Sequence, residues 1–146
     1  MRPRYRDPLV REVPKVAKYR SDLAYSFLRR GLARGDLGDP AGAAADARRA
    51  VALWEDLPSR TNEGWVQSAC ARAALAGLAG RAGSGVPAAE AVGEADVAMA
   101  LLGKAVAMGY RSPALFRTEA LDPLRRREDF QKLLAELEKK PSAQPE

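Results

Sequence analysis

Three side chains that lie off the apolar faces of expected helices could bind another molecule. Tyr25 and Arg29 are one helical turn apart, so both would lie on the same side of a helix. A guanidinium beside a phenol ring suits an acidic group or a C-terminal carboxylate, because it donates charge-assisted hydrogen bonds. Arg72 is their counterpart on the expected third helix. Tyr25, Arg29 and Arg72 are therefore candidate partner-binding residues; the alternative is that they are ordinary solvated residues.

The sequence offers little for catalysis. It contains no histidine, which removes the commonest general base, nucleophile activator and metal ligand. Glu90 and Glu94 share a helix face at i, i+4 spacing, and a solvated face accounts for them. Six further carboxylates are expected at helix caps or solvent-facing positions: Asp36, Asp39, Asp46, Glu55, Glu63 and Asp96. The chain is predicted not to be an enzyme and to hold no metal or cofactor.

Cys70 is the single cysteine, so the chain cannot form an internal disulfide. We expect it to pack as a small hydrophobic residue, because a nucleophilic thiol would lack its usual base. The glycine-rich residues 80–85 lack the lysine and hydroxyl residue that end a P-loop. The sequence has no apolar run of about 18 residues, and residues 1–13 lack the apolar core of a signal peptide. These features predict a cytoplasmic protein with no membrane segment.

Positive charge is concentrated near the N-terminus. Residues 1–34 contain ten Lys and Arg against three Asp and Glu, whereas the whole chain carries a net charge of +5. Such a segment can attract nucleic acid or another acidic surface. The alternative is a solvated helix face in an arginine-rich and alanine-rich chain.

The spacing of apolar residues predicts an all-α protein, since alanine is abundant and aromatic and β-branched residues are scarce. Residues 1–17 contain Pro3, Pro8 and Pro14 and are expected to be a basic, partly extended segment. A helical domain should follow over residues 18–140, with hairpins at about 18–56 and 61–109 and a cap at 112–140. Residues 141–146 are expected to be a disordered tail.

Individual helices are predicted from caps and periodicity. The first runs from residue 18 or 21 to 34, the second from 39 to about 55, the third from 63 to 79 and the fourth from 87 to 108, with a possible break at Gly93. Ser21, Asp39 and Thr61 or Asn62 are the expected N-caps. In the fourth helix the expected buried ridge is Val97, Leu101, Ala105 and Met108, widened by Leu102 and Val106. Residues 128–139 have the sharpest amphipathic pattern and should cover one end of the domain.

The two hairpins repeat one another. Gly31-Leu32-Ala33 recurs as Gly77-Leu78-Ala79, and Ala50-Val51-Ala52 recurs as Ala105-Val106-Ala107. Tandem helix–turn–helix units are typical of α-solenoids.

The chain resembles tetratricopeptide-repeat (TPR) proteins, and in particular the C-terminal TPR region of bacterial eukaryote-like serine/threonine kinases. The resemblance covers about residues 18–137 and is most specific at Gly109-Tyr110, at residues 121–125 (LDPLR) and at Asp129-Phe130. No glycine-rich loop with a catalytic lysine, His-Arg-Asp or Asp-Phe-Gly motif is present, so kinase activity is not implied. The resemblance implies antiparallel hairpins stacked as a short TPR-like α-solenoid with a C-terminal capping helix.

In TPR families the first helix of each hairpin contributes to a concave surface that holds a segment of a partner. We therefore expect a non-catalytic adaptor or scaffold that binds another protein or peptide on this surface. One alternative is nucleic-acid or acidic-surface binding through the basic N-terminal segment. Another alternative is a terminal segment of a larger TPR array. Its apolar strip would then be partly exposed, so that the chain would be a monomer or a weak homodimer. The residues of this strip are Leu9, Val10, Val13 and Val16.

Overall fold

The computed structural model describes residues 2–57 and 60–139, and within these ranges the chain is helical with no strand. The long helices are α1 (Arg2–Asp36), α2 (Pro40–Glu55), α3 (Asn62–Leu78), α4 (Ala91–Ala107) and α6 (Glu128–Lys139). Shorter elements are the 3₁₀ turn η1 (Ala88–Glu90), α5 (Pro113–Phe116) and the 3₁₀ helix η2 (Glu119–Leu124). The prediction of an all-helical fold whose helices pack against each other is confirmed. The predicted tail at 141–146 lies outside the described residues.

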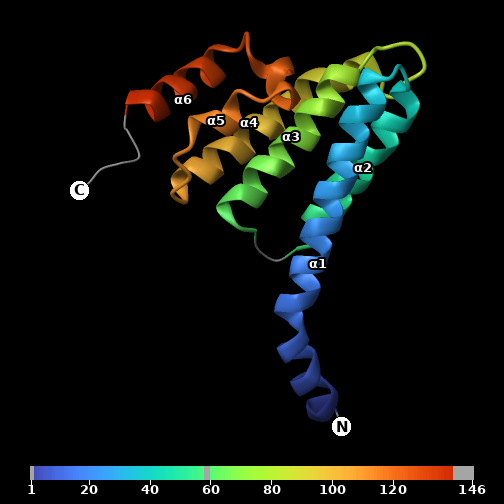
Figure 1. Cartoon of the computed structure of the whole chain (residues 1–146), viewed down its shortest axis with the longest axis vertical. Helices are drawn as coiled ribbons and strands as arrows, with labels where there is room; N and C mark the ends of the chain where they lie inside the picture. The colour runs from blue at the N-terminus through green and yellow to red at the C-terminus, as the bar shows by residue number, and fades with distance from the viewer. Residues whose placement is uncertain (1, 58–59, 140–146) are drawn as a thin grey trace.

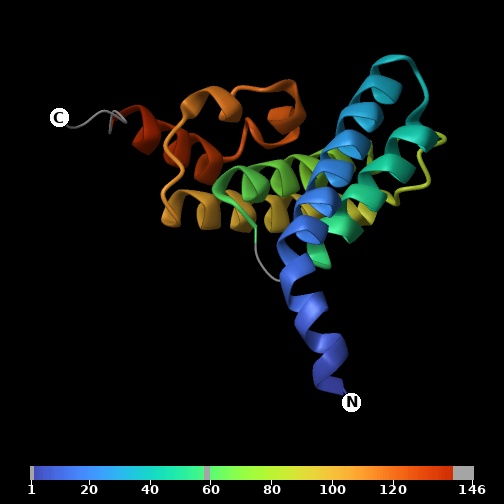
Figure 2. The same ribbon diagram turned by 60° about the horizontal axis from the view of Figure 1, so that its bottom comes forward.

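The prediction of an extended segment over residues 1–17 is wrong for residues 2–17, which form the first half of α1. Proline fixes φ near −65°, a value that an α-helix shares, so each proline removes one hydrogen bond without forcing the chain to be extended. Figures 1 and 2 both show this half of α1 projecting beyond the other helices. The first helix therefore begins well before the predicted start at residue 18 or 21.

Two antiparallel hairpins, α1 with α2 and α3 with α4, form most of the structure, and α2 packs against α3. The N-caps predicted for α2 and α3 are confirmed, whereas Ser21, predicted to cap the first helix, lies inside α1. The Asp39 carboxylate accepts a hydrogen bond of 2.9 Å from the Gly42 amide, and Pro40 occupies the first helical position. The Thr61 hydroxyl accepts one of 3.0 Å from the Gly64 amide. Local sequence chemistry thus sets where α2 and α3 begin.

Close contact between helices depends on small residues. Gly31 of α1 is buried against α2, and a Cβ atom at this position would lie 3.0 Å from the Asp46 Cβ and 3.1 Å from the Ala43 carbonyl oxygen. Few large side chains are fully buried, with Trp54 and Leu102 among them. The rest of the core at the helix interfaces is largely alanine: Ala24, Ala44, Ala47, Ala50, Ala69, Ala71, Ala73, Ala98 and Ala105.

The predicted ridge of α4 is wrong at two of its four positions. Ala105 is buried, but Val97 and Met108 are 39% and 50% exposed. The buried residues of α4 are Ala95, Ala98, Leu102 and Ala105, so burial is confirmed for Leu102 and Ala105 and was missed for Ala95 and Ala98. The reason is that α4 packs closely against the alanine-rich α3, so its smallest side chains face the partner helix. Gly93 does not interrupt α4; the irregularity is the 3₁₀ turn η1 before it.

The C-terminal elements cover the second hairpin, with η2 against α3 and α6 against α4 and α5. Tyr110, Phe116 and Phe130 stack with centroid distances of 6.1 and 5.9 Å. The Arg125 guanidinium donates to the backbone carbonyls of Phe116 and Thr118, at 2.9 and 2.6 Å. It thereby satisfies polar groups of the irregular segment between α5 and α6.

We expect Gly31→Val to lower the free energy of unfolding by about 1–3 kcal/mol, because the added methyl groups would push α1 away from α2. Gly103→Ala is the matched control: a Cβ at Gly103 meets nothing within 4 Å. It should raise stability by about 0.5–1 kcal/mol, since alanine is the better helix former. Urea unfolding followed by circular dichroism measures both. Equal effects of the two changes would contradict close packing at Gly31.

Candidate functional site

One face of the structure is hollowed between α1 and α3. A hollow of about 240 Å³ and a second of about 580 Å³ lie on the same side of α1, where it faces α3. Residues of α1 that border them recur at helical spacing: Lys18, Ser21, Tyr25, Leu28, Leu32 and Asp36. Opposite them on α3 are Glu63, Gln67, Ala74, Gly77 and Leu78. We call these two hollows together the α1–α3 groove, the smaller one its upper hollow and the larger one its lower hollow.

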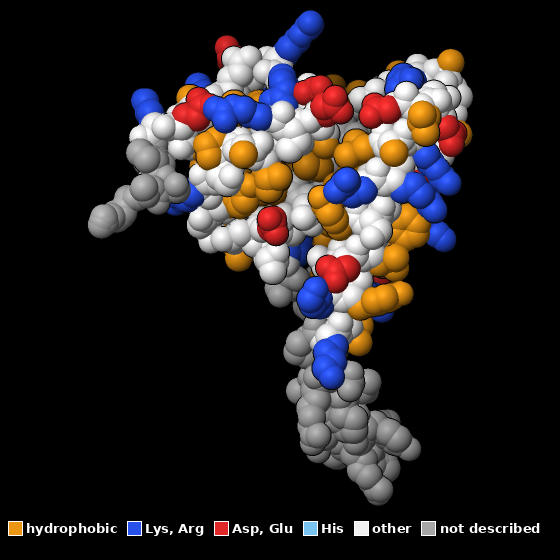
Figure 3. Space-filling model, in the orientation of Figure 1, with side chains coloured by type: hydrophobic (Ala, Val, Ile, Leu, Met, Phe, Trp, Pro, Cys, Tyr) orange, Lys and Arg blue, Asp and Glu red, His pale blue; other side chains and the backbone are white. Residues whose placement is uncertain are grey.

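The upper hollow has an apolar floor and a charged rim. Glycine and alanine residues of α1, α2 and α3 form much of the floor, and Pro123 of η2 lies at its side. The rim carries Asp36, Glu119 and Asp122 against Arg81. Figure 3 looks onto this face and shows apolar side chains between the helices, with acidic ones gathered at the upper end near η2. The upper hollow can accept an apolar side chain whose neighbours are basic.

The lower hollow is more polar. It is lined by Tyr25 and by charged residues of both signs, among them Arg60 and Glu63. Lys18 and Asp22 form an exposed i, i+4 ion pair of 3.0 Å on its α1 side. Opposite charges are therefore balanced here, unlike at the rim of the upper hollow.

Two of the three candidate partner-binding residues lie together. Tyr25 is 38% exposed and borders the lower hollow. The Arg29 guanidinium donates a hydrogen bond of 3.3 Å to the Tyr25 hydroxyl, and its centre lies 5.7 Å from the ring centroid. The pair therefore presents a cation and a ring side by side at the edge of the groove. Their role in binding remains a prediction.

Arg72 does not join them. Its guanidinium donates to Glu55 of α2 and, at 3.0 Å, to Glu94 of α4, so it lies on the side of α3 that faces α2 and α4. The Glu94 side chain is only 16% exposed. The expectation of a solvent-facing position is therefore wrong for Glu94, whereas Glu55 is 56% exposed as expected. Through Arg72 the two glutamates tie three helices together. The geometry separates Arg72 from Tyr25 and Arg29.

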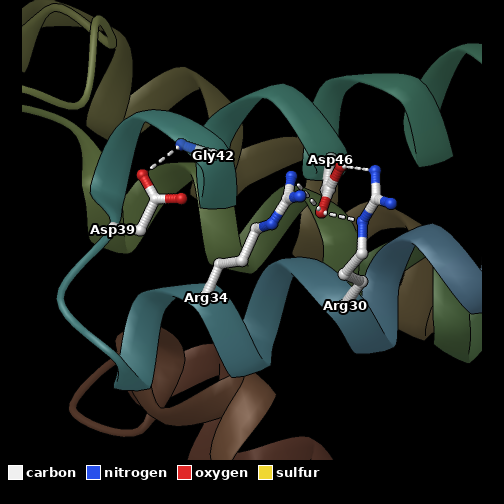
Figure 4. A network of polar contacts seen from close by, with 5 residues as sticks. All are labelled: Arg30, Arg34, Asp39, Gly42 and Asp46. Carbon is white, nitrogen blue, oxygen red and sulfur yellow. Dashed lines mark hydrogen bonds and ion pairs between the residues drawn. The ribbon is translucent and has the colours of Figure 1, made fainter.

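Asp46 also departs from the expected solvent-facing position, since it is 2% exposed. Figure 4 shows its carboxylate between α1 and α2, with two arginines of α1 directed at it. Arg30 donates through Nε and Nη2 at 2.9 Å each, and Arg34 donates through Nη1 at 3.2 Å. The hydrogen bonds from Arg30, followed by the positive charges of Arg30, Arg34 and Arg49, hold the pKa of Asp46 below its ordinary value although burial opposes the shift. A sequence pattern could have revealed this buried ion pair. Arg30 and Arg34 are one helical turn apart on one helix, and Asp46 stands among alanines on the helix opposite.

Cys70 packs as predicted, buried in α3. Burial raises the pKa of its thiol to about 12. Among the side chains that the structure describes, at residues 15–57 and 60–139, there is no group of three or more acidic, cysteine or histidine side chains arranged to hold a metal ion. Over the same residues, no helix combines the length and the apolar character that a membrane span requires. That the protein is not an enzyme remains a prediction from the sequence.

No protein-family model matches the sequence, and neither a curated protein nor a solved structure matches the chain. The similarity to TPR regions of bacterial kinases therefore remains a prediction from residues 18–137. Function has to be inferred from the α1–α3 groove and from the distribution of charge.

We expect Asp46 to contribute stability at neutral pH that is lost in acid. Its pKa is lower in the folded chain than the ordinary value of about 3.8, so ionisation favours folding. This contribution is complete above the ordinary pKa and disappears as the pH falls through the lower value of the folded state. Asp46→Asn should cost about 1–3 kcal/mol at neutral pH, because it breaks charge-assisted hydrogen bonds to a buried acceptor.

The check is the free energy of urea unfolding measured from about pH 7 to about pH 2. Asp46→Asn should flatten the acid limb of this curve. Glu90→Gln removes an exposed carboxylate of η1 and should follow the wild type. An acid limb unchanged in Asp46→Asn would show that the carboxylate makes no such contribution.

The Cys70 thiol should resist modification in the folded chain. With a pKa of about 12 and a buried side chain, it is protonated and inaccessible at ordinary pH. Its reaction with a chromogenic aromatic disulfide should be at least about a hundredfold slower than in urea. Rapid reaction without urea would indicate that α3 opens readily.

Proposed function

We propose that this chain is a non-catalytic protein–protein interaction module of the TPR type, which binds an extended segment of a partner in the α1–α3 groove. The observation that carries the proposal is the pair of hollows between the first helices of the two hairpins. Clefts with an apolar floor and a few polar groups at the rim are the usual form of binding sites.

The helix arrangement supports this function. The helices pair as two successive hairpins, α1 with α2 and α3 with α4, and the last elements cover one end of the array. Stacked hairpins with an atypical terminal element are the architecture of short α-solenoids, which present extended binding surfaces. The groove lies between α1 and α3, where such a surface is expected.

The charges along the groove favour one orientation of the partner. Tyr25 and Arg29, at the edge of the lower hollow, suit an acidic group or a C-terminal carboxylate. Asp36 and Glu119, at the rim of the upper hollow, suit a lysine or arginine beside an apolar anchor. We infer a segment with a basic, apolar part in the upper hollow and an acidic end near Tyr25. The lone, buried Cys70 is compatible with a reducing cytoplasm.

Exposed apolar residues on α1 favour a second candidate, a terminal segment of a larger array. Val16 and Tyr19 are 46% and 66% exposed, and such a strip could pack against another repeat or a second copy. Leu9, Val10 and Val13 belong to the same predicted strip, but their side chains lie outside the described residues. Concentration-dependent sedimentation of the wild type and of Tyr19→Ser separates a weak homodimer from a monomer.

The groove can be tested by selecting binders from a phage-displayed library of random linear peptides. Ala74→Trp should fill the upper hollow and weaken the selected peptides by at least about tenfold, a loss of about 1.4 kcal/mol. Ala45→Trp is the matched control, since Ala45 is exposed on α2 and lies outside the groove. Thermal unfolding verifies that both variants are folded. Peptides that bind both variants equally, or a library that yields none, would overturn the proposed function.

A further inference from the structure

A third hollow lies on the side of α3 that faces α2 and α4. Its volume is about 170 Å³, and its walls include the side chains of Val51 on α2 and Leu101 on α4. We call it the α2–α4 hollow. Successive residues of a helix are about 100° apart, so Trp65 and Arg72 at this hollow lie opposite Gln67 at the groove. A cavity of about 150 Å³ can hold benzene, so this hollow has room for one ring.

Both tryptophans of the chain border the α2–α4 hollow. Trp54 is 1% exposed, and the indole Nε1 atoms of Trp54 and Trp65 are both buried. Among the described residues, neither indole N–H has a hydrogen-bond acceptor. Buried donors in native proteins are nearly always paired, and an indole N–H can only donate. The two indoles therefore offer donors to an acceptor on a bound molecule.

Positive charge at the hollow exceeds negative charge. Arg72 is bound to both nearby carboxylates, those of Glu55 and Glu94. The Arg60 guanidinium donates through Nε to the Trp54 carbonyl oxygen at 3.0 Å, and among the described residues no ion pair joins it to an acidic side chain. Burial, together with the charge of Arg72, lowers the pKa of Arg60 from its ordinary value, although Glu55 opposes this shift. An anion beside Arg60 would stabilise its charged form.

The Trp65 ring already carries two cations. The centre of the Arg60 guanidinium lies 4.4 Å from the ring centroid, and the Lys104 ammonium nitrogen lies 5.1 Å from it. These two groups use the attraction of the ring for positive charge. A cationic ligand in the hollow would be repelled by them, whereas an anionic ligand would be attracted. The charges thus select an anion.

We propose that the α2–α4 hollow binds a small monocarboxylate with a compact apolar body, such as a single ring. The body would lie against Val51, Leu101 and the indole rings, and the carboxylate would accept hydrogen bonds from Arg60 and an indole N–H. One guanidinium without an ion pair matches the single charge of a carboxylate better than the double charge of a phosphate monoester. This site does not depend on the proposed peptide binding, since of the described residues only Arg60 lines both this hollow and the groove.

The test is a titration with cyclohexanecarboxylate, which has one ring and does not absorb the light that excites tryptophan. Intrinsic fluorescence reports binding, because both tryptophans border the hollow. Saturation-transfer NMR on the ligand is an independent measurement. Cyclohexanecarboxamide has the same body without the charge, and acetate has the charge without the body. We expect saturable binding of cyclohexanecarboxylate that is at least about tenfold tighter than that of either control compound.

Two pairs of variants locate the binding site. Val97→Phe should fill part of the hollow and weaken cyclohexanecarboxylate by at least about tenfold. Val92→Phe is its matched control, since Val92 is 70% exposed on the same helix and lies outside the hollow. Arg60→Gln should abolish the preference for the carboxylate over the amide, whereas Arg126→Gln, at an exposed position, should retain it. Circular dichroism verifies that the variants are folded.

Tyr25→Ser and Ala74→Trp separate this site from the groove. Tyr25 borders the lower hollow and Ala74 the upper one, and neither lines the α2–α4 hollow, so carboxylate binding should be unchanged in both variants. Loss of binding in either variant would place the ligand in the groove and overturn the proposal. It is also overturned if the wild type gives no saturable signal in either measurement, if the amide binds as tightly, or if Val97→Phe binds as Val92→Phe does.

Discussion

The contact between α1 and α2 is the constraint on which the other features depend. Gly31 lets the two helix backbones approach, and this approach places the Asp46 carboxylate against α1 with little room for water. A carboxylate in that position has to be hydrogen-bonded, because an unpaired buried charge is costly. Arg30 and Arg34 meet this need from consecutive turns of α1. The geometry of the first hairpin thus depends on both the small residue Gly31 and the buried charge of Asp46.

The small side chains at the helix interfaces also determine the shape of the groove. Alanine and glycine at the interfaces allow helices to lie close together, so the space between α1 and α3 is bordered by short side chains. A helix pair with leucine or phenylalanine at Gly35, Ala74 or Gly77 would fill the upper hollow. The hollow is therefore a consequence of the packing that stabilises the hairpins, and η2 limits it on one side.

Local rules predicted the parts of the fold that local chemistry decides. Asp39 and Thr61 cap α2 and α3 as expected, and the strong amphipathic pattern located α6 at Glu128–Lys139. The misses have another origin. Four features that depend on context were missed. They are the helix propensity between the prolines of α1, the buried face of α4, the burial of Asp46 and the pairing of Arg72. The last three depend on which residue of another helix lies opposite, and a single sequence does not carry that information when many positions are alanine.

α1 contributes charged side chains both to the groove and to the contact with α2. Its side toward α3 borders the groove, where Asp36 contributes to an acidic rim, and its side toward α2 carries Arg30 and Arg34. Because successive residues of a helix are about 100° apart, one helix can present these opposite charges within two turns. The acidic rim favours a basic part of a partner in the upper hollow, whereas Arg30 and Arg34 are bound to Asp46 in the contact with α2. The charges of α1 are thus divided between the proposed groove and the contact that holds the first hairpin together.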